Sequence, residues 1–273
     1  ILPENIFATS EFNALEKVDR CLVSVSSTVA LEAANRLLRE TSAKIIMTTK
    51  GLDKETCQPF SKMITEADRY FLLSGPSFAD EVIAGLPTAV TLSSTNVEEL
   101  SVISKEIHSK LLRVYSSTDV IGAEIGGSVK NIIAIASGVV DGAGLGRNAR
   151  AALVTRGLHE MRRLALAMGA RQETLSGLSG LGDLLLTATS AQSRNYKAGQ
   201  LLGMGKKCSD LGSEIIGVIE GIHNAPLVRK LAREYGVELP IVDVVNMLLN
   251  EDISLSEGID LLMSRTQKDE ANL

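Results

Sequence analysis

Short apolar runs of strand length alternate with helical stretches over the first 118 residues of the chain. A helical stretch at 29–40 separates the first two runs. This strand–helix–strand alternation predicts a sheet that contains parallel pairs joined by helical crossovers. The predicted strands are Cys21–Ser26, Lys44–Thr49, Tyr70–Ser74, Thr88–Ser93 and Leu111–Tyr115.

From about Ser117 to the end, the apolar positions follow a helical spacing instead. One buried stripe runs through 153–168 and ends at Gly169, and another runs through 227–235 and ends at Gly236. We therefore expect an α/β plus all-α chain, with an α/β domain over residues 1–118 and an all-helical domain over residues 119–273.

Composition narrows the class of protein. The chain has 273 residues, a net charge of −5 and 45% hydrophobic residues. It has no basic tract that could follow a nucleic-acid backbone. Its longest mostly apolar stretch, Ile132–Val140, is too short for an integral membrane segment. Three cysteines without paired spacing favour neither a disulfide framework nor a metal site. We expect a cytoplasmic protein that binds no metal and no nucleic acid.

Two strand exits carry residues suited to an anionic ligand. Lys50-Gly51 and Gly75-Pro76-Ser77 each follow a predicted strand, and ligands of open α/β sheets bind at such carboxyl ends. Glycine allows backbone amides to approach an anion, and a serine hydroxyl adds a donor. The alternative interpretation is that both segments are ordinary turns.

A glycine pair inside a predicted helix precedes a lysine. Gly126 and Gly127 cost a helix interior on the order of 1–2 kcal/mol, so we expect another part of the chain to approach the backbone there. Lys130 shares a face with small residues, and a buried lysine can act as an acid or base. A lysine that snorkels at a helix–helix contact is the alternative.

Two further segments of the helical half carry polar groups. Gly177-Leu-Ser-Gly-Leu-Gly182 precedes a helix start at Asp183, and Thr187 lies four residues on, on the same face. Ser193-Arg194-Asn195 holds an arginine whose planar group suits a phosphate or a carboxylate. A favourable helix-dipole charge and a surface arginine are the simpler interpretations.

The segment Gly142-Ala-Gly-Leu-Gly146 is similar to a dinucleotide fingerprint, but it follows no predicted strand. Because the fingerprint needs a strand–loop–helix context, we predict a tight loop between two helices instead.

In combination, these segments resemble the soluble, bacterial-type NAD(P)-dependent glycerol-3-phosphate dehydrogenases, in which they occur in the same order. Residues 218–221 are similar to that family's late cofactor motif. The segments that carry the resemblance are Thr49–Gly51, Ser74–Glu81, Glu124–Asn131, Asp141–Leu153, Gly177–Asp183 and Ser193–Asn195.

The resemblance implies a Rossmann-type domain similar to that of 6-phosphogluconate dehydrogenase, a helical domain, and a homodimer. It implies reduction of dihydroxyacetone phosphate to sn-glycerol 3-phosphate with NAD or NADP as cofactor, for phospholipid synthesis. It makes Lys130 the catalytic acid/base, with Asp183 and Thr187 beside it. The implied substrate contacts are Lys50, Gly75, Ser77, Lys130, Asn131, Asp183, Ser193, Arg194 and Asn195. The implied cofactor contacts are Lys50, Ala79, Arg194, Val218 and Glu220.

The chain departs from the family pattern near its start. No G-x-G-x-x-G precedes the strand at Cys21, so the family's N-terminal glycine-rich unit is not found and we expect weak cofactor binding. Two alternatives remain open at this point. One is a related lysine-dependent reductase of β-hydroxy or keto acids, and the other is a truncated, non-catalytic dimerisation module.

Overall fold

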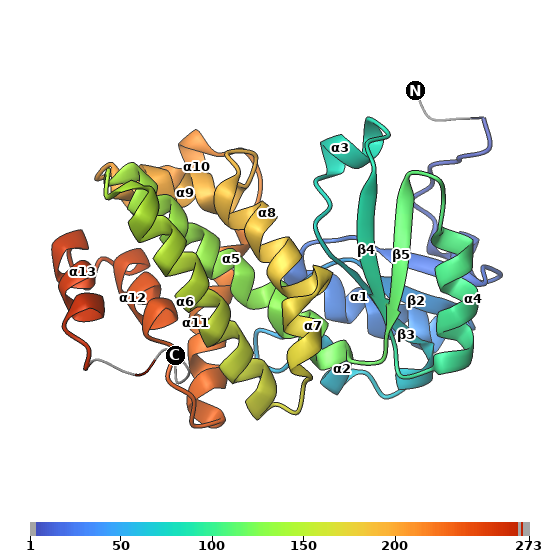
Figure 1. Ribbon diagram of the computed structural model, residues 1–273. Helices are drawn as coiled ribbons and strands as arrows, with labels where there is room; N and C mark the ends of the chain where they lie inside the picture. Colours follow the sequence, from blue (N-terminus) through green and yellow to red (C-terminus); the bar gives the residue numbers. More distant parts are fainter. Residues whose placement is uncertain (1–3, 267–268, 270–273) are drawn as a thin grey trace.

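The computed structural model describes residues 4–266 and 269, and its strands form one five-stranded sheet (Figure 1). The strands lie side by side in chain order, and each predicted strand has a counterpart. The strands are β1 (Arg20–Val23), β2 (Lys44–Met47), β3 (Tyr70–Ser74), β4 (Thr88–Ser93) and β5 (Leu112–Ser117).

The predicted parallel pairs are present, with one exception. β1 with β2, β2 with β3, and β4 with β5 are parallel, whereas β3 and β4 are antiparallel. The connection from Ser74 to Thr88 holds only the short helix α3 (Ala79–Ile83), which does not carry the chain back across the sheet. The chain therefore reverses direction there, and the Gly75–Ser77 turn begins that reversal.

Helices cover both faces of the sheet. α1 (Ser27–Glu40) packs its buried Ala30 and Ala34 onto one face, with Ile45 and Met47 of β2. α4 (Val97–Ile107) covers the other face, against Ile46. Alternate residues of β2 thus point to opposite faces, as the pleat of a strand requires. The short elements of this half are η1 (Phe12–Leu15), α2 (Phe60–Met63) and η2 (Ala67–Arg69).

The second half of the described chain is helical and lies beside the sheet (Figure 1). Its first helix, α5 (Val120–Gly142), begins three residues after β5 and runs through the middle of this half. The remaining elements are α6 (Gly146–Ala167), α7 (Gln172–Ser176), η3 (Leu178–Gly182), α8 (Asp183–Thr189), α9 (Arg194–Gly203), η4 (Cys208–Asp210), α10 (Leu211–Glu214), α11 (Glu220–Glu234), α12 (Pro240–Leu249) and α13 (Leu255–Met263).

Helix α5 is the core of the helical half. It is long and apolar enough to cross a membrane, but 94% of its most apolar window is buried inside the protein. Its side chains pack with Met161 and Leu164 of α6, and with Val228 and Leu231 of α11. The helix therefore owes its apolar composition to burial among other helices.

The segment at 142–146 is the tight inter-helix loop that the sequence predicts. α5 ends at Gly142 and α6 begins at Gly146. Gly144 has a φ of 68° and Gly146 a φ of 88°, in the left-handed region that glycine adopts without strain. The resemblance of this loop to a dinucleotide fingerprint is thus coincidental.

Candidate active site

Two lysines share one buried aspartate where the sheet meets the helical half. Lys130 Nζ lies 2.6 Å from Asp183 Oδ1, and Lys50 Nζ lies 2.8 Å from Asp183 Oδ2. Lys130 also donates to Thr187 Oγ1 at 3.0 Å, and Thr187 in turn donates to the Asp183 carbonyl. Asp183 is 2% exposed and Lys130 is 8% exposed. The sequence predicted that these four residues form part of one site, and the structure brings them together.

Local structure explains why the four side chains meet. Lys50 follows β2, at the carboxyl end of the parallel pair β1–β2. Lys130 projects from α5, while Asp183 opens α8 and Thr187 follows one turn later. Residues four apart share a helix face, so Asp183 and Thr187 both reach the lysine.

The glycine pair in α5 admits the groups that build this cluster. A Cβ at Gly126 would lie 2.6 Å from the Ser179 carbonyl oxygen, and one at Gly127 would lie 2.8 Å from Lys50 Cγ. Real Cβ atoms do not approach that closely, so larger residues would push both neighbours away. The sequence predicted a close approach to the α5 backbone. At Gly126 the approaching segment is η3, and at Gly127 it is the side chain of Lys50.

Burial and the second lysine change the acidity of Lys130. Desolvation lowers its pKa, the charge of Lys50 lowers it further, and Asp183 opposes both, which leaves the pKa at about 8. Burial alone would raise the pKa of Asp183, but the charges of Lys50 and Lys130 outweigh burial and hold that pKa below its usual range. Two ammonium groups with one carboxylate leave one excess positive charge, which favours an anionic ligand.

The turn after β3 lies next to this cluster. Gly75 has a φ of 149°, and a Cβ added there would lie 3.0 Å from Val90 Cα, so a side chain would strain the turn. Ser77 donates back to the Gly75 carbonyl at 3.2 Å. A Cβ at Gly182 would lie 3.6 Å from Pro76, which brings the turn against the residue before Asp183.

Hydrogen bonds of two asparagine side chains connect the three helices α5, α9 and α11 next to Lys130. Asn195 donates to Asn131 Oδ1 at 3.0 Å and accepts from the Gly221 N–H at 2.8 Å. Asn131 donates to the Gly127 carbonyl at 3.3 Å. Both asparagines are at most 8% exposed. These hydrogen bonds fix α9 and α11 relative to α5, a role that the sequence pattern did not indicate.

The residues of the Ser193–Asn195 segment have different structural roles. Ser193 is the N-cap of α9, because its side chain accepts from the Tyr196 N–H at 3.2 Å. Arg194 is exposed and crosses Gly217, where a Cβ would lie 2.5 Å from its NH1 atom. Within residues 4–266, no hydrogen bond joins Arg194 to the lysine cluster. Its guanidinium thus remains available for a ligand.

The other predicted cofactor contacts are Val218, Glu220 and Ala79. Val218 is exposed beside Gly217, and Glu220 accepts from Ser27 Oγ at 2.6 Å. That hydrogen bond connects the start of α1 to the start of α11. Ala79 is exposed at the start of α3.

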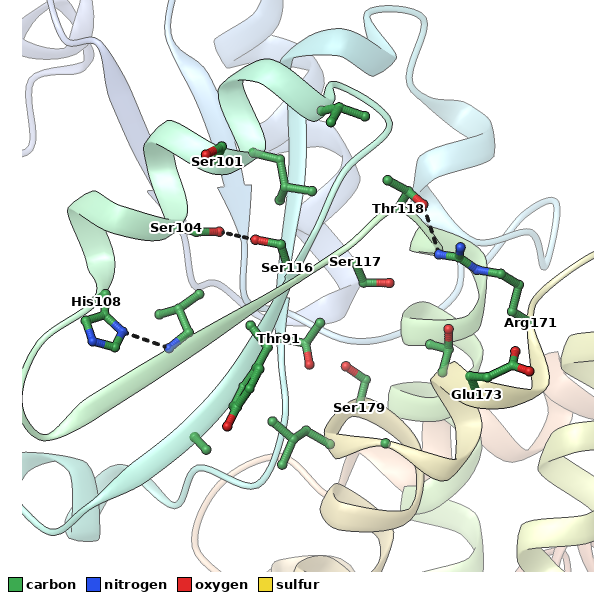
Figure 2. Close-up of a pocket in the computed structure, with 18 of the residues that line it drawn as sticks. Thr91, Ser101, Ser104, His108, Ser116, Ser117, Thr118, Arg171, Glu173 and Ser179 are labelled. Atoms are coloured by element: carbon green, nitrogen blue, oxygen red, sulfur yellow. Dashed lines mark hydrogen bonds between the residues drawn. The ribbon is translucent and has the colours of Figure 1, made fainter.

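A large groove in the described part of the chain does not include the lysine cluster. It has a volume of about 1270 Å³ and follows the free edge of β5, between α4 and the α7–η3 segment. Figure 2 shows His108 at one end and Arg171 at the other, with Ser116 and Ser117 between them. Only 177–179 of the glycine-rich segment reach it. Size alone therefore does not locate the chemistry, and the buried charges do.

Sequence patterns did not single out the buried carboxylate of Glu124. Glu124 of α5 is 2% exposed and accepts hydrogen bonds from Ser61 and Tyr70. In the sequence, it stands out only as a charged residue inside a mostly apolar helix. Its two partners had no signal, because serine and tyrosine at those positions fit an ordinary turn and strand.

The sheet and the helical half define a two-part protein, α/β and then all-α, with a buried lysine that can serve as an acid or base. Family models for the N-terminus and the C-terminus of NAD-dependent glycerol-3-phosphate dehydrogenase match residues 1–100 and 119–260. The chain belongs to this NAD-dependent glycerol-3-phosphate dehydrogenase family.

Relatives in sequence and in structure agree with this assignment. A glycerol-3-phosphate dehydrogenase [NAD(P)+] of Erythrobacter litoralis is 45% identical over 91% of this chain and 76% of its own length. That of Sphingopyxis alaskensis is 42% identical over 98% and 82%. The crystal structure of glycerol-3-phosphate dehydrogenase from Coxiella burnetii superposes with a TM-score of 0.90 at 40% identity, over 96% of this chain and 82% of that one.

Proposed function

We propose that the protein interconverts dihydroxyacetone phosphate and sn-glycerol 3-phosphate with NAD(P)H, and so supplies glycerophospholipid synthesis. The observation that carries the proposal is the cluster of Lys50, Lys130 and Asp183 with its excess positive charge, in which Lys130 and Asp183 are buried and Lys50 is half-buried. Such a trio suits a substrate that is itself an anion and that develops negative charge on oxygen during reduction. The division at 118/119, a homodimer and a cytoplasmic location belong to the same proposal.

Lys130 is the acid/base of the proposed reaction. During reduction, its ammonium donates a proton to the carbonyl oxygen as that oxygen becomes an alkoxide. In the reverse direction, the neutral amine accepts the hydroxyl proton. Asp183 and Thr187 hold Nζ in place, and Lys50 adds a second positive charge beside the substrate.

The remaining polar residues bind and orient the substrate. Arg194 is assigned to the phosphate, because its guanidinium is exposed and planar and can bind two oxygens at once. Gly75 and Ser77 contribute the turn beside the cluster. Asn131, Ser193 and Asn195 hold the helices that carry these groups. A fixed substrate brings the reacting carbon into position at a lower entropic cost.

The residues present fit a nicotinamide cofactor. Gly217 has no side chain and a φ of 98°, so Arg194 can lie across it, beside Val218. Glu220 is tied to Ser27 at the start of α1, close to the carboxyl end of β1. We assign Lys50, Ala79, Arg194, Val218 and Glu220 to cofactor binding. When bound, NAD(P)H supplies the hydride.

The proposal is tested by substrate comparison with the full-length protein encoded by the gene. We expect NAD(P)H oxidation with dihydroxyacetone phosphate, and a kcat/KM at least about 100-fold lower with unphosphorylated dihydroxyacetone, since charge-assisted hydrogen bonds are lost. Preference for a β-keto acid would favour the related reductase instead. A folded dimer without turnover of either substrate would favour the dimerisation module.

Removal of Arg194 is expected to weaken phosphate binding. In Arg194→Ala, KM for dihydroxyacetone phosphate should rise by about 10- to 100-fold, because hydrogen bonds to charged groups contribute about 1.5–3 kcal/mol. Lys197→Ala is the matched control, since Lys197 is an exposed cation on the same helix. Steady-state kinetics measure both variants. A rise in KM for NAD(P)H alone would assign Arg194 to the cofactor only.

The direction of the reaction sets the expected pH dependence. Reduction needs protonated Lys130, whose pKa is about 8, so kcat/KM for reduction should fall as pH rises through about 8. Oxidation needs the neutral amine, so its rate should rise over the same interval. Initial rates in both directions between pH 6 and about 10 measure this. Profiles with the same slope in both directions would contradict the assignment.

A further inference from the structure

Glu124 connects the central helix of the helical half to two elements of the sheet half. It lies in the second turn of α5, and its side chain is buried. Oε1 accepts from the Ser61 N–H at 3.0 Å and from Tyr70 Oη at 2.9 Å, while Oε2 accepts from Ser61 Oγ. Ser61 belongs to α2 and Tyr70 begins β3, so one carboxylate holds three elements together.

The two elements that Glu124 holds flank the segments of the candidate site. Lys50 and its loop lead into α2, and β3 leads into the Gly75–Ser77 turn. The other end of the connection is α5, which carries Lys130 six residues after Glu124, about 9 Å along the helix axis. Gly127 lies between them and supports the Lys50 stem. The distances from Lys130 to Lys50 and to the Gly75–Ser77 turn therefore depend on how α5 is placed against the sheet half.

Burial and its hydrogen bonds set the acidity of Glu124. Burial raises its pKa to about 7, and hydrogen bonds from Ser61 and Tyr70, with the nearby charge of Lys62, oppose the rise. Burial, and then the charge and hydrogen bond of Glu124, raise the pKa of Tyr70, which stays a neutral donor. Without the carboxylate, the Ser61 N–H and the Tyr70 hydroxyl would be buried donors that lack an acceptor. The contact is thus sensitive to small changes in Glu124.

We propose that Glu124 is a positioning residue for Lys130: its hydrogen bonds to Ser61 and Tyr70 set α5 against the Lys50 and Gly75 segments. The inference rests on the proposed function for its kinetic test. Glu124 touches neither Lys130 nor Asp183, and it acts only through the placement of α5. A lysine displaced by a fraction of an ångström keeps its charge but loses alignment with the carbonyl oxygen.

Two variants test the proposal, with one matched control. Glu124→Gln keeps the side-chain volume but replaces a charged acceptor of three donors by a neutral amide. Tyr70→Phe removes one donor and leaves the carboxylate in place. Glu160→Gln is the control, because Glu160 is also buried, 1% exposed, and accepts from two backbone N–H groups, those of Ile241 and Val242. Those groups begin α12, away from the lysine cluster.

In the full-length protein, kcat should fall about 10- to 100-fold in Glu124→Gln and about 10-fold in Tyr70→Phe, since small misplacements cost up to about 10²-fold. KM should change by less than about threefold, because the binding groups remain, and Glu160→Gln should keep kcat within about twofold. The double variant with Glu124→Gln and Tyr70→Phe should be no slower than Glu124→Gln alone, because both substitutions disrupt the same contact.

A second readout separates this inference from the proposed reaction. Lysine side-chain 15N NMR follows the Nζ signal of Lys130, which should move in Glu124→Gln and stay in Glu160→Gln. If the wild-type protein does not reduce dihydroxyacetone phosphate, the proposed function fails, and a moved Lys130 signal still supports the positioning role. Equal kcat in wild type and Glu124→Gln, or an unmoved Lys130 signal, would overturn it.

Discussion

Replacing Lys130 with alanine is expected to lower kcat for reduction of dihydroxyacetone phosphate by about 10³-fold, within the 10²- to 10⁴-fold range of positioned proton donors. The loss follows because, among the residues that the structure describes, no other ammonium is as deeply buried beside Asp183 and Thr187. Lys50 reaches the same carboxylate but comes from the sheet side and makes no hydrogen bond to Thr187. It should replace Lys130 poorly.

The fold should survive this change, which keeps the kinetic result interpretable. Asp183 retains Lys50 at 2.8 Å, so no buried charge is left alone. Lys230→Ala is a suitable control, because Lys230 is an exposed lysine of α11. Steady-state rates with circular dichroism would compare the three proteins. A kcat for Lys130→Ala within about tenfold of wild type would remove this lysine from the chemistry.

Replacing Asp183 with asparagine is expected to cost about 3–5 kcal/mol of unfolding free energy at pH 7, as breaking a buried ion pair does. Two ammonium groups would then face each other without the carboxylate between them. Activity should fall as well, because the amide holds neither lysine by charge. Urea unfolding of wild type and variant measures the difference.

The loss of stability in Asp183→Asn should depend on pH, with a definite sign. The folded-state pKa of Lys130 is already lowered to about 8 from 10.5, and loss of Asp183 lowers it further. Below the lowered pKa the penalty is fully present. As pH rises from there towards 10.5, the unfolded chain binds more protons than the folded one, so stability increases. Stability of the variant that falls over this interval would contradict the account.

Sequence reasoning recovered the residues that sit close together along the chain. Asp183 and Thr187 were paired by their four-residue spacing, and the glycine pair at 126–127 signalled a close approach. Both predictions hold, because helix periodicity fixes which side chains share a face. The strand positions were recovered for a similar reason, since alternating buried runs leave a clear pattern.

Patterns of spacing along the chain did not pair distant segments, and only the family resemblance placed Lys50, Lys130 and Asp183 in one site. Lys50 shares Asp183 across 133 residues, and Ser61 reaches Glu124 across 63. No local pattern encodes such distances. The antiparallel direction of β4 was also missed, because strand patterns do not carry direction. The glycine-rich segment before Asp183 forms a π-helical turn, whose close approach to Leu175 only glycine at position 180 allows.

The lysine pair on the buried Asp183 is proposed to serve reduction of a phosphorylated ketone. The most direct measurement is the rate of NAD(P)H oxidation when dihydroxyacetone phosphate is added to the full-length protein, wild type beside Lys130→Ala. We predict sustained oxidation by the wild type and about 10³-fold slower oxidation by the variant. Equal rates in the two proteins, or no oxidation by a folded wild type, would contradict the account.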